Sequence, residues 1–578
     1  MAARSLRIAH VLGLAALIAA CSSGGGGGES GPAPVITSGF GESAATLVVS
    51  DGQTAVTTVS ATHPDATETL TFALHGGSDQ ARFSIDPTTG ALSLNVAPSY
   101  ANPVDANADN VYEVAVSVSD STGAQDEQTI SVVVGFAVDT LEDVVDGDLS
   151  AGDRSLREAI GFVPDGGAVT FAPTLSGQTL VLAAGEVAIA KNLMIDGDVG
   201  NDGHPDITID ADSQSRIFLV EDGSGTANRV VRLSGLWLEG GMTDGDGGAV
   251  LNRENVVMVD CILLENGTNG NDADGGAIAS GPGSLTLTAS SVIGNSTAGD
   301  GSAGGGIYNE SGALTITASV VAQNETTGED SDGGGIYSLG GELIVRTTDI
   351  DDNATSGTSS GGGIFVQDGG SFTIAQSTIR YNTIEGSGRG GAIFAITSVI
   401  TPNTPFGTIV NSTIHGNHAA DEGGGIYLFG GRLRISNSTI TSNTGAPGGG
   451  IASDGLFPGE NTRIEVASSI VASNAPSDVD IDFFFGSVNP LTSRGGNVIG
   501  TGNATDAFSA SEVIGAADPM LENLDDYGGP TPTRVPMATS PAIGAGRNPQ
   551  HLATDQRGRV RTFGGSTDAG AVERDGTD

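Results

Sequence analysis

The residues GGGIYNESGALTITASVVAQNETTGEDSD (Gly304–Asp332) are followed at once by GGGIYSLGGELIVRTTDIDDNATSGTSS (Gly333–Ser360), a second copy with small changes. Eight such copies begin between residues 247 and 448. Each copy closes on an asparagine: Asn266, Asn295, Asn324, Asn353, Asn382, Asn417, Asn443 and Asn474. The first four intervals between these asparagines are all 29 residues. A fixed period of this length predicts a stack of like units.

The pattern inside one copy predicts what each unit is. Leu, Ile and Val alternate with Thr in runs such as LTITAS, which indicates short strands with one buried face. We therefore predict an all-β chain built around a parallel β-helix, in which each strand pairs with its copy in the next turn about 4.8 Å away. The glycines permit tight bends. We expect the asparagines, in left-handed backbone, to form a hydrogen-bonded column at one corner.

Composition limits the partners. The chain has 578 residues, of which 90 are glycine, and a formal net charge of −46. A chain of this length exceeds one ordinary compact domain, but a solenoid can grow without a single large core. So acidic a surface argues against nucleic acid. It favours cations, calcium above all, although acidity also serves solubility in salty surroundings.

The N-terminal segment predicts export. Two arginines precede an apolar stretch over residues 8–20, which is typical of a secretory signal. LIAAC (Leu17–Cys21) resembles the bacterial lipobox. This resemblance implies lipidation of Cys21 and anchoring to the outer membrane or cell surface; the alternative is a plain signal with a chance cysteine. Residues 1–21 are then the signal and 22–31 a Gly-rich tether. Cys261 is left without a partner, and we expect it to be buried.

Residues 32–137 predict a separate small β-sandwich, because short strands recur there at sandwich spacing. LTFALHGGSDQARFSID (Leu70–Asp86) and YANPVDANADNVYEVAVSVSD (Tyr100–Asp120) resemble a bacterial cadherin-like module. The resemblance implies a calcium site, with the candidate ligands Glu42, Asp105, Asp109 and Asp120. His63 departs from the family pattern, since it stands where the motif has Asp, and only one module is present. The alternative is a rigid spacer.

Residues 138–241 are expected to begin the β-helix. RSLREAI (Arg154–Ile160) predicts a short capped helix. The phrase resembles the capping region before bacterial right-handed β-helices with GGGIYN repeats, of the polymorphic outer membrane protein type. In DVGNDGHPD, the carboxylates of Asp198, Asp202 and Asp206 have the spacing of ligands around one cation. This loop predicts calcium, with an acidic turn as the alternative.

The β-helix repeats are assigned to residues 242–515 and a cap to 516–578. The phrases DPMLENLDDYGGPTPTRVP (Asp518–Pro536), TDQRG (Thr554–Gly558) and DAGAVE (Asp568–Glu573) resemble the choice-of-anchor Q domain of bacterial surface proteins. In that family the domain precedes a C-terminal anchoring signal. Here no apolar tail follows, so we expect the anchor to be at Cys21. TDQRG and DAGAVE are expected to close the last turn and cover its edge strands.

One column of side chains departs from uniformity. In five consecutive copies the residue after the repeat isoleucine is aromatic, namely Tyr308, Tyr337, Phe365, Phe394 and Tyr427. Neighbours of an inward isoleucine point outward, so these rings are expected to form a ladder at strand-to-strand spacing. A sugar polymer could stack along them. Alternatively, the rings cover one another.

Signals for catalysis are weak. Acidic residues precede several Gly runs (Asp272, Asp274, Asp300, Glu329, Asp330, Asp332, Asp421 and Glu422), with Arg346, Arg380, Arg389, Arg432 and Arg434 nearby in sequence. Lyases and hydrolases of the pectin lyase-like β-helix type use such groups, but no turn stands out except at two insertions, 396–407 and 454–461. We expect a lipid-anchored, non-catalytic, calcium-binding adhesion protein. Its expected partner is a polysaccharide, the matrix or another surface protein; the alternative is a polysaccharide lyase or glycoside hydrolase.

Overall fold

A computed structural model describes residues 32–367, 370–396, 407–455, 462–483, 490–509, 511–516, 518–576 and 578. Cys21 and the tether lie outside these ranges. The chain divides into two compact units, each treated separately below. The first contains Met1–Val181, Lys191–Thr208 and Arg232–Leu236, and the second Leu182–Ala190, Ile209–Val231 and Trp237–Asp578. No helix within the described ranges has the length and apolarity needed to cross a membrane.

A β-sandwich forms most of the first unit. One sheet contains β2 (Ala44–Ser50), β5 (Thr71–Gly76), β8 (Val111–Ser119) and β9 (Gln125–Val138). The other contains β3 (Ala55–Thr58), β6 (Phe83–Ile85) and β7 (Ala91–Leu94), while β1 (Val35–Ile36) pairs with β4 (Ala61–Thr62). Short 3-10 turns, η2 (Ser38–Gly41) and η3 (Gln80–Arg82), connect them. Alternate residues of β8 and β9, such as Val114, Val116 and Val132, fill the core between the sheets.

Strand β9 extends past the predicted boundary between residues 137 and 138. Its first part pairs antiparallel with β8, and its last three residues pair parallel with β10 (Gly167–Phe171). The first unit also contains β11 (Gln178–Val181), β13 (Leu193–Asp196), η4 (Pro173–Leu175) and the helix α1 (Leu156–Phe162). The capping box predicted for α1 is present, with Ser155 and Glu158 bonded reciprocally. Sandwich and first β-helix strands thus share one continuous strand.

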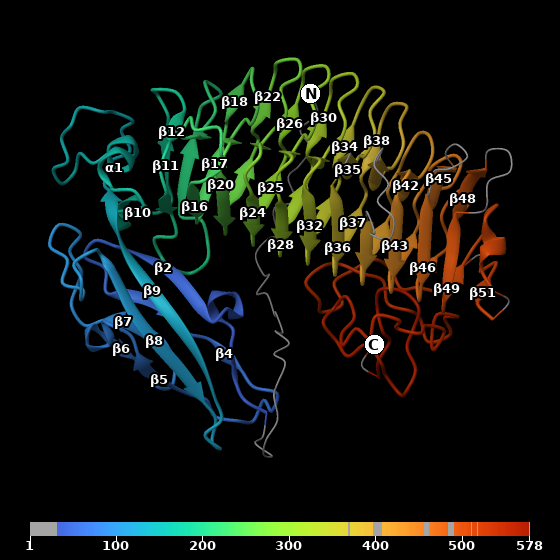
Figure 1. Cartoon of the computed structure of the whole chain (residues 1–578), viewed down its shortest axis with the longest axis horizontal. Helices are drawn as coiled ribbons and strands as arrows, with labels where there is room; N and C mark the ends of the chain where they lie inside the picture. The colour runs from blue at the N-terminus through green and yellow to red at the C-terminus, as the bar shows by residue number, and fades with distance from the viewer. Residues whose placement is uncertain are drawn as a thin grey trace. The chain divides into compact units, whose positions relative to one another are not determined.

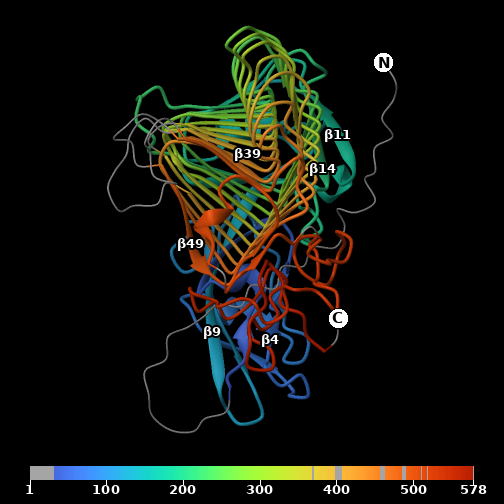
Figure 2. The same cartoon turned by 90° about the vertical axis from the view of Figure 1, so that its right-hand side faces the viewer.

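The second unit is a parallel β-solenoid, and the chain as a whole forms about 12 turns (Figures 1 and 2). A typical turn contains β27 (Ile307–Glu310), β28 (Leu314–Thr317), β29 (Val320–Ala322) and β30 (Glu325–Thr326). These strands belong to four different sheets, which we call sheets 1 to 4 in that order. The predicted fold class, a parallel β-helix preceded by a small sandwich, is confirmed.

The strands of each sheet follow at one per turn. Sheet 1 continues through β12 (Val187–Ile189), β15 (Phe218–Val220), β19 (Val250–Asn252), β23 (Ile278–Ser280), β27, β31 (Ile336–Leu339), β35 (Ile364–Gln367), β39 (Ile393–Ile396), β42 (Ile426–Phe429), β45 (Ile451–Gly455) and β48 (Val479–Phe483). Sheet 4 contains β18 (Met242–Thr243), β22 (Gly267–Thr268), β26 (Ser296–Thr297), β30, β34 (Ala354–Thr355) and β38 (Thr383–Ile384).

Sheets 2 and 3 form the long lateral faces. In the second unit, sheet 2 contains β20 (Asn255–Val259), β24 (Leu285–Thr288), β28, β32 (Glu342–Arg346), β36 (Ser371–Ala375), β40 (Gly407–Val410), β43 (Arg432–Ser436), β46 (Arg463–Ala467) and β49 (Leu491–Gly495). Sheet 3 contains β17 (Leu236–Glu239), β21 (Ile262–Leu264), β25 (Ser291–Ile293), β29, β33 (Asp349–Asp351), β37 (Thr378–Arg380), β41 (Thr413–His415), β44 (Thr439–Thr441), β47 (Ile470–Val471), β50 (Val498–Ile499) and β51 (Val513–Ile514). Strands β14 (Ile207–Asp210), β16 (Val230–Ser234) and β17 contribute residues to both units, and η5 (Thr505–Ala507) follows sheet 3's β50.

The repeat places identical residues above one another. Ile307, Ile336 and Ile364 are direct register partners, and all three are fully buried. The GGG segments also stack, since the N–H of Gly305 donates to the carbonyl of Gly333. Glycine is required there because a Cβ on Gly305 would lie 2.5 Å from the carbonyl oxygen of Gly334. Burial of the aliphatic columns and backbone pairing together hold the stack.

The asparagine column forms as predicted, but its backbone conformation differs from the prediction. The side-chain amide of each asparagine donates to the side-chain oxygen of the next, as from Asn324 to Asn353 at 2.9 Å. Left-handed backbone is found instead at the residue before each asparagine, for example Gln323 and Asp352. The asparagine side chains thereby turn inward, where all eight are buried. A second column, of serine and threonine, begins above Cys261, which is buried as expected.

The C-terminal segment does not close the last turn, contrary to expectation. Its backbone and side chains bond along the outside of four successive turns, through Gln556 to Thr378, Thr554 to Asn411, Ala571 to Thr439 and Arg547 to Ser468. The segment is drawn in red below β43, β46 and β49 in Figure 1. Outward positions of sheet 3 explain this, because Ile470 and Ala472 form an apolar surface there that packs on Leu521, Ala542 and Ala569.

Candidate functional site

The predicted calcium loop is a turn held by its own carboxylates. Asp198 accepts the backbone N–H groups of Asp202 and Gly203, and Asp206 accepts that of Gly200 and the hydroxyl of Ser176. Burial, and then the neighbouring acids, raise the pKa of Asp198. Across all described residues, no three Asp, Glu, His or Cys side chains gather in a group that could hold a metal ion. The arrangement therefore lends no support to calcium here, which stays a prediction.

Three of the four cadherin-type candidates also accept backbone N–H groups. Asp105 accepts from the N–H groups of Asn107, Asp109 and Asn110, and Asp109 accepts from Val111. Asp120 accepts from Thr122 and Ala124, while Glu42 is exposed. Nε2 of His63 lies 3.5 Å from a carboxylate oxygen of Asp120. A histidine thus occupies the space beside Asp120, and the calcium prediction for this set is likewise untested.

The predicted aromatic ladder is present on sheet 1. Tyr308, Tyr337, Phe365, Phe394 and Tyr427 are register partners, and successive ring centroids are 4.8–5.3 Å apart with planes within 16° of parallel. Phe365, Phe394 and Tyr427 are buried, whereas Tyr308 and Tyr337 are half-buried. Ring faces inside the ladder therefore contact other rings, which is the geometry of the second alternative. The sugar-stacking prediction is left with ring edges and with the half-buried Tyr308 and Tyr337, and the Tyr337 hydroxyl is bonded to Gln367.

A straight row of short side chains lies on the outer face of sheet 2. Thr286, Thr315, Ile344, Thr373 and Thr408 occupy one register position in consecutive turns. All five are half-buried. Because the inward neighbours of these residues are buried and in direct register, the row repeats at one-strand spacing of about 4.8 Å.

Four arginines follow this row on the last turns of sheet 2. Arg432, Arg434, Arg463 and Arg494 each lie within 3.4 Å of a carboxylate oxygen of Glu465, a set that we call the arginine patch. Glu465 is 6% exposed, while Arg434, Arg463 and Arg494 are 43%, 41% and 49% exposed. Burial alone would raise the pKa of Glu465, but the arginines, Arg494 first, hold it below its usual range.

A second charged cluster lies on sheet 3. One guanidinium nitrogen of Arg380 is 2.8 Å from a carboxylate oxygen of Asp349 and 2.8 Å from one of Asp351. Burial, followed by the charge of Asp349, raises the pKa of Asp351 to about 7. Burial lowers the pKa of His415, the register partner of Arg380, to about 4. The half-exposed ring of Tyr381 packs edge-on to His415.

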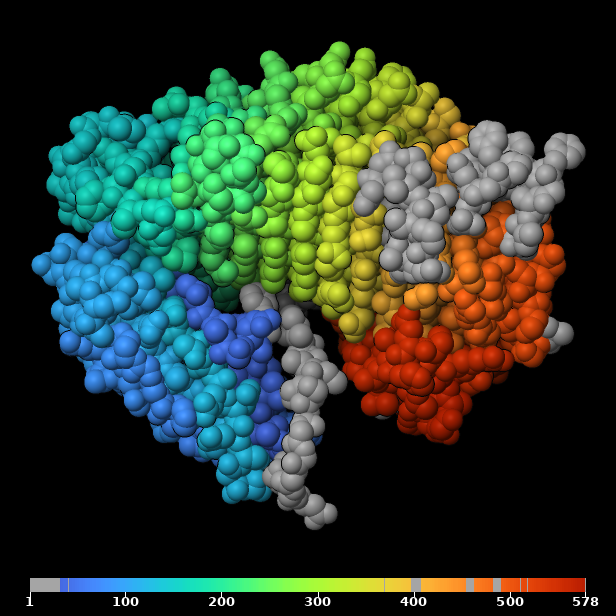
Figure 3. All heavy atoms as spheres, in the orientation of Figure 1, coloured from blue at the N-terminus to red at the C-terminus, as the bar shows by residue number. Residues whose placement is uncertain are grey.

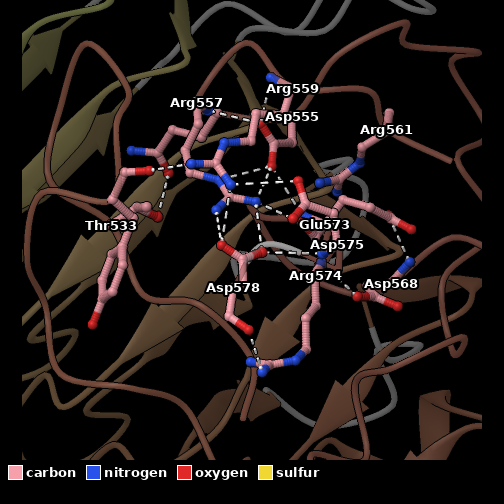
Figure 4. Close-up of polar contacts among 12 residues, drawn as sticks. Thr533, Asp555, Arg557, Arg559, Arg561, Asp568, Glu573, Arg574, Asp575 and Asp578 are labelled. Carbon is pink, nitrogen blue, oxygen red and sulfur yellow. Dashed lines mark hydrogen bonds and ion pairs between the residues drawn. The ribbon is translucent and has the colours of Figure 1, made fainter. Parts of the chain in front are cut away.

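A network of ionic contacts also lies in the C-terminal segment (Figure 4). Arg557 pairs with Asp555 at 3.0 Å and with Asp578 at 2.6 Å, and its side chain is completely buried. Arg561 is also buried and donates to the carbonyl of Gly570, so burial lowers its pKa to about 10. These groups face one another around the TDQRG and DAGAVE phrases. Arg557 and Arg561 are thus engaged inside the segment, where their contacts hold its loops together.

A shallow hollow of about 470 Å³ lies near the start of the second unit. It is lined by Glu186, Ser213, Gln214, Ser215, Arg216, Met242, Thr243, Asp244 and Asn269. Arg216 bonds to Glu186 and to the carbonyls of Asp246 and Gly247, so its donors are engaged.

The sequence alone pointed to Arg432 and Arg434, but not to Glu465, Arg463, Arg494, Asp349 or Asp351. The period carried a signal for three of them, because Asp349 and Asp351 are the register partners of Val320 and Ala322, and Glu465 is the register partner of Thr492. The sequence pattern did not give the strand register that brings these charged residues together, because that register depends on the length of each intervening loop.

Comparison with solved structures finds cadherin ectodomains. Drosophila N-cadherin EC1-3 is 20% identical over 18% of this chain and 33% of its own, with a TM-score of 0.16. Protocadherin Gamma B2 domains 3-6 give 19% identity, 19% and 23% coverage and a TM-score of 0.14. Protocadherin Gamma B7 domains 1-4 are 17% identical over 20% of this chain and 29% of their own, with a TM-score of 0.16. The chain thus spans a third or less of these proteins. No protein-family model and no curated protein matches it.

Proposed function

We propose that this chain is a lipid-anchored surface protein whose β-solenoid binds a polysaccharide or matrix polymer without cleaving it. The observation that supports this best is the row on sheet 2, formed by Thr286, Thr315, Ile344, Thr373 and Thr408 in direct register. Successive turns form parallel ridges, seen from green to orange in Figure 3. A long, periodic surface suits an extended polymer better than a small ligand.

The chemistry of the row suits sugar hydroxyl groups. Each threonine hydroxyl is one donor and an acceptor with two lone pairs, so it can bond to a sugar hydroxyl in either sense. The strands that carry it are held by the buried aliphatic and asparagine columns. The protein strands therefore lose little conformational freedom when a polymer binds along the row, which favours binding.

Threonine-to-valine substitutions test the proposal. The triple variant Thr315→Val, Thr373→Val and Thr408→Val removes three hydroxyl groups while keeping β-branched shape. A matched control changes three exposed strand threonines of the sandwich, Thr58, Thr71 and Thr129, to valine. Affinity electrophoresis in gels containing neutral and acidic polysaccharides should show retention of the wild type and control, and reduced retention of the triple variant. Absence of retention of the wild type on every polymer would overturn the proposal.

A polysaccharide hydrolase or lyase is the second candidate. The observation that favours it is the sheet 3 cluster, where Asp349 and Asp351 share one nitrogen of Arg380 and the pKa of Asp351 is raised to about 7. A protonated carboxylic acid beside a second carboxylate is the pairing that glycoside hydrolysis uses. A reducing-end assay on wild type and Asp351→Asn distinguishes the two candidates, since only an enzyme releases new ends. The predicted insertion loops lie mostly outside the described residues.

Lipid anchoring is tested independently of binding. Cys21 lies outside the described residues, and the proposal depends on the LIAAC motif alone. Expression of the full chain with a radiolabelled fatty acid should label the wild type and not Cys21→Ala, and the variant should leave the membrane fraction. Cys261→Ala is the matched control, because Cys261 is buried in the solenoid. Equal labelling of wild type and Cys21→Ala would contradict the anchor.

A further inference from the structure

We propose that the arginine patch binds the negatively charged groups of an acidic polysaccharide, either a uronic-acid polymer or a sulfated one. The inference rests on the proposed function and specifies its ligand class. Its basis is the convergence of Arg432, Arg434, Arg463 and Arg494 on the single carboxylate of Glu465. No comparison assigns a role to these residues.

The patch has more donors than its own carboxylate uses. Arg432, Arg463 and Arg494 all approach Oε1 of Glu465, and Arg434 approaches Oε2. Each guanidinium carries five N–H donors in a planar fork, so most of these donors point elsewhere. The side chains of Arg434, Arg463 and Arg494 are more than two-fifths exposed. Carboxylate and sulfate groups accept such forks with paired hydrogen bonds.

Glu465 makes the patch a prearranged site. A cluster of four like charges would otherwise repel itself and spread into solvent. The buried carboxylate draws the guanidinium groups together and leaves the patch with an excess of positive charge. Arginine is suited to this position because its charge persists at all physiological pH values. A ligand anion then replaces water on groups whose positions are already set.

The location of the patch continues the threonine row. Thr408 is the register partner of Arg434, which in turn pairs with Glu465. A polymer lying along the row therefore reaches the guanidinium groups with the same chain. Nucleic acid is the less favoured polyanion, because proteins that bind single strands stack the bases on aromatic side chains, and the four arginines and Glu465 of the patch include none.

The experiment compares two triple variants with the same change in charge. The patch variant is Arg434→Gln, Arg463→Gln and Arg494→Gln, which leaves Arg432 beside Glu465. The control variant is Arg82→Gln, Arg229→Gln and Arg253→Gln, none of which lies on a strand of sheet 2. Binding of the full chain is measured by biolayer interferometry on polygalacturonate, dextran sulfate, neutral dextran and single-stranded DNA, at low and high salt, with circular dichroism to confirm folding.

The outcomes separate the two proposals. We expect the wild type to bind at least one of the acidic polysaccharides more tightly than dextran. Affinity for that polymer should fall by about tenfold or more in the patch variant and change little in the control. High salt should weaken the binding of the wild type. Equal binding of wild type and folded patch variant to the acidic polymers would overturn the patch and leave polysaccharide binding intact. Binding to DNA alone would overturn the acidic-glycan assignment. Failure of the wild type on all polysaccharides would overturn the proposed function itself.

Discussion

The side-chain amide of Asn474 donates to Oδ1 of Asp478 at 2.9 Å, so the column of asparagines ends on a carboxylate. The other oxygen of Asp478 accepts the backbone N–H of Thr501 at 2.7 Å. An ionised aspartate can only accept, which suits a position where every neighbouring group is a donor. At the opposite end, the N–H of Gly241 donates to Asn266. The column is thus bonded from its first member to its last.

Breaking the column inside the stack should be costly. In Asn353→Ala, the backbone and side-chain N–H groups of Asn324 lose their common acceptor, and the carbonyl of Val321 loses a donor. These groups are buried, so we expect the free energy of unfolding of the solenoid to fall by about 3 kcal/mol. Urea unfolding followed by circular dichroism measures it. Asn523→Ala, at an exposed position, is the control, and an equal loss in both variants would contradict the role of the column.

The solenoid should be more stable in mild acid than in mild base. Burial raises the pKa of Asp274 to about 7 and that of Asp332 to about 6, whereas an unfolded aspartate has a pKa of about 4. Between pH 4 and pH 7 the folded state therefore binds more protons, and its stability falls as pH rises through this window, then levels off. We expect a higher Tm at pH 5 than at pH 8 by scanning calorimetry.

Asparagine substitutions identify the groups responsible. Asp274→Asn with Asp332→Asn should raise the Tm at pH 8 and shrink the difference between the two pH values, because an amide keeps the acceptor for Ala303 and Ser360 without a buried charge. Asp300→Asn, at an exposed position of the same loops, should change little. A pH dependence that survives undiminished in the double variant would show that other groups cause it.

Gln556 should hold the C-terminal segment on the solenoid. Its amide donates to Thr378 and Thr531 at 2.9 Å, its carbonyl accepts from Thr413 at 2.7 Å, and it is completely buried. Gln556→Ala removes these bonds and leaves a cavity, so we expect faster cleavage of residues 518–578 in limited proteolysis. Repeat turns should remain resistant. Gln550→Ala, at an exposed position, is the matched control; identical cleavage of the two variants would refute this role.

The aromatic ladder should matter for stability. Phe365 stacks between Tyr337 and Phe394 at 4.9 and 4.8 Å, so Phe365→Ala removes two ring contacts and opens a cavity. We expect a loss of about 3 kcal/mol in the free energy of unfolding, measured by urea denaturation. Polysaccharide retention of the folded variant tests the other alternative. Unchanged retention is expected from the stacked geometry, and reduced retention would favour sugar binding on the ladder.

Several parts of the fold could be predicted because, in a stack of copies, the sequence period itself shows which distant residues lie next to one another. Once Asn324 and Asn353 are recognised as copies, their stacking follows, and so do the columns of Ile307 and Tyr308. The Ser155 cap is equally local, since it depends on residues three apart. The conformation of the corner was less accessible, because either the asparagine or the residue before it could adopt the left-handed backbone.

The sequence by itself therefore determined the all-β class, the parallel stack, the asparagine column and the aromatic ladder, since each depends on a period that can be counted. Tertiary structure alone decided which face receives the C-terminal segment and which charged residues meet. Gln556 reaches Thr378 across 178 residues, and Arg494 reaches Glu465 across 29. The reason is physical: those contacts depend on loop lengths, on outward packing surfaces and on the competition of several arginines for one buried carboxylate, none of which has a period.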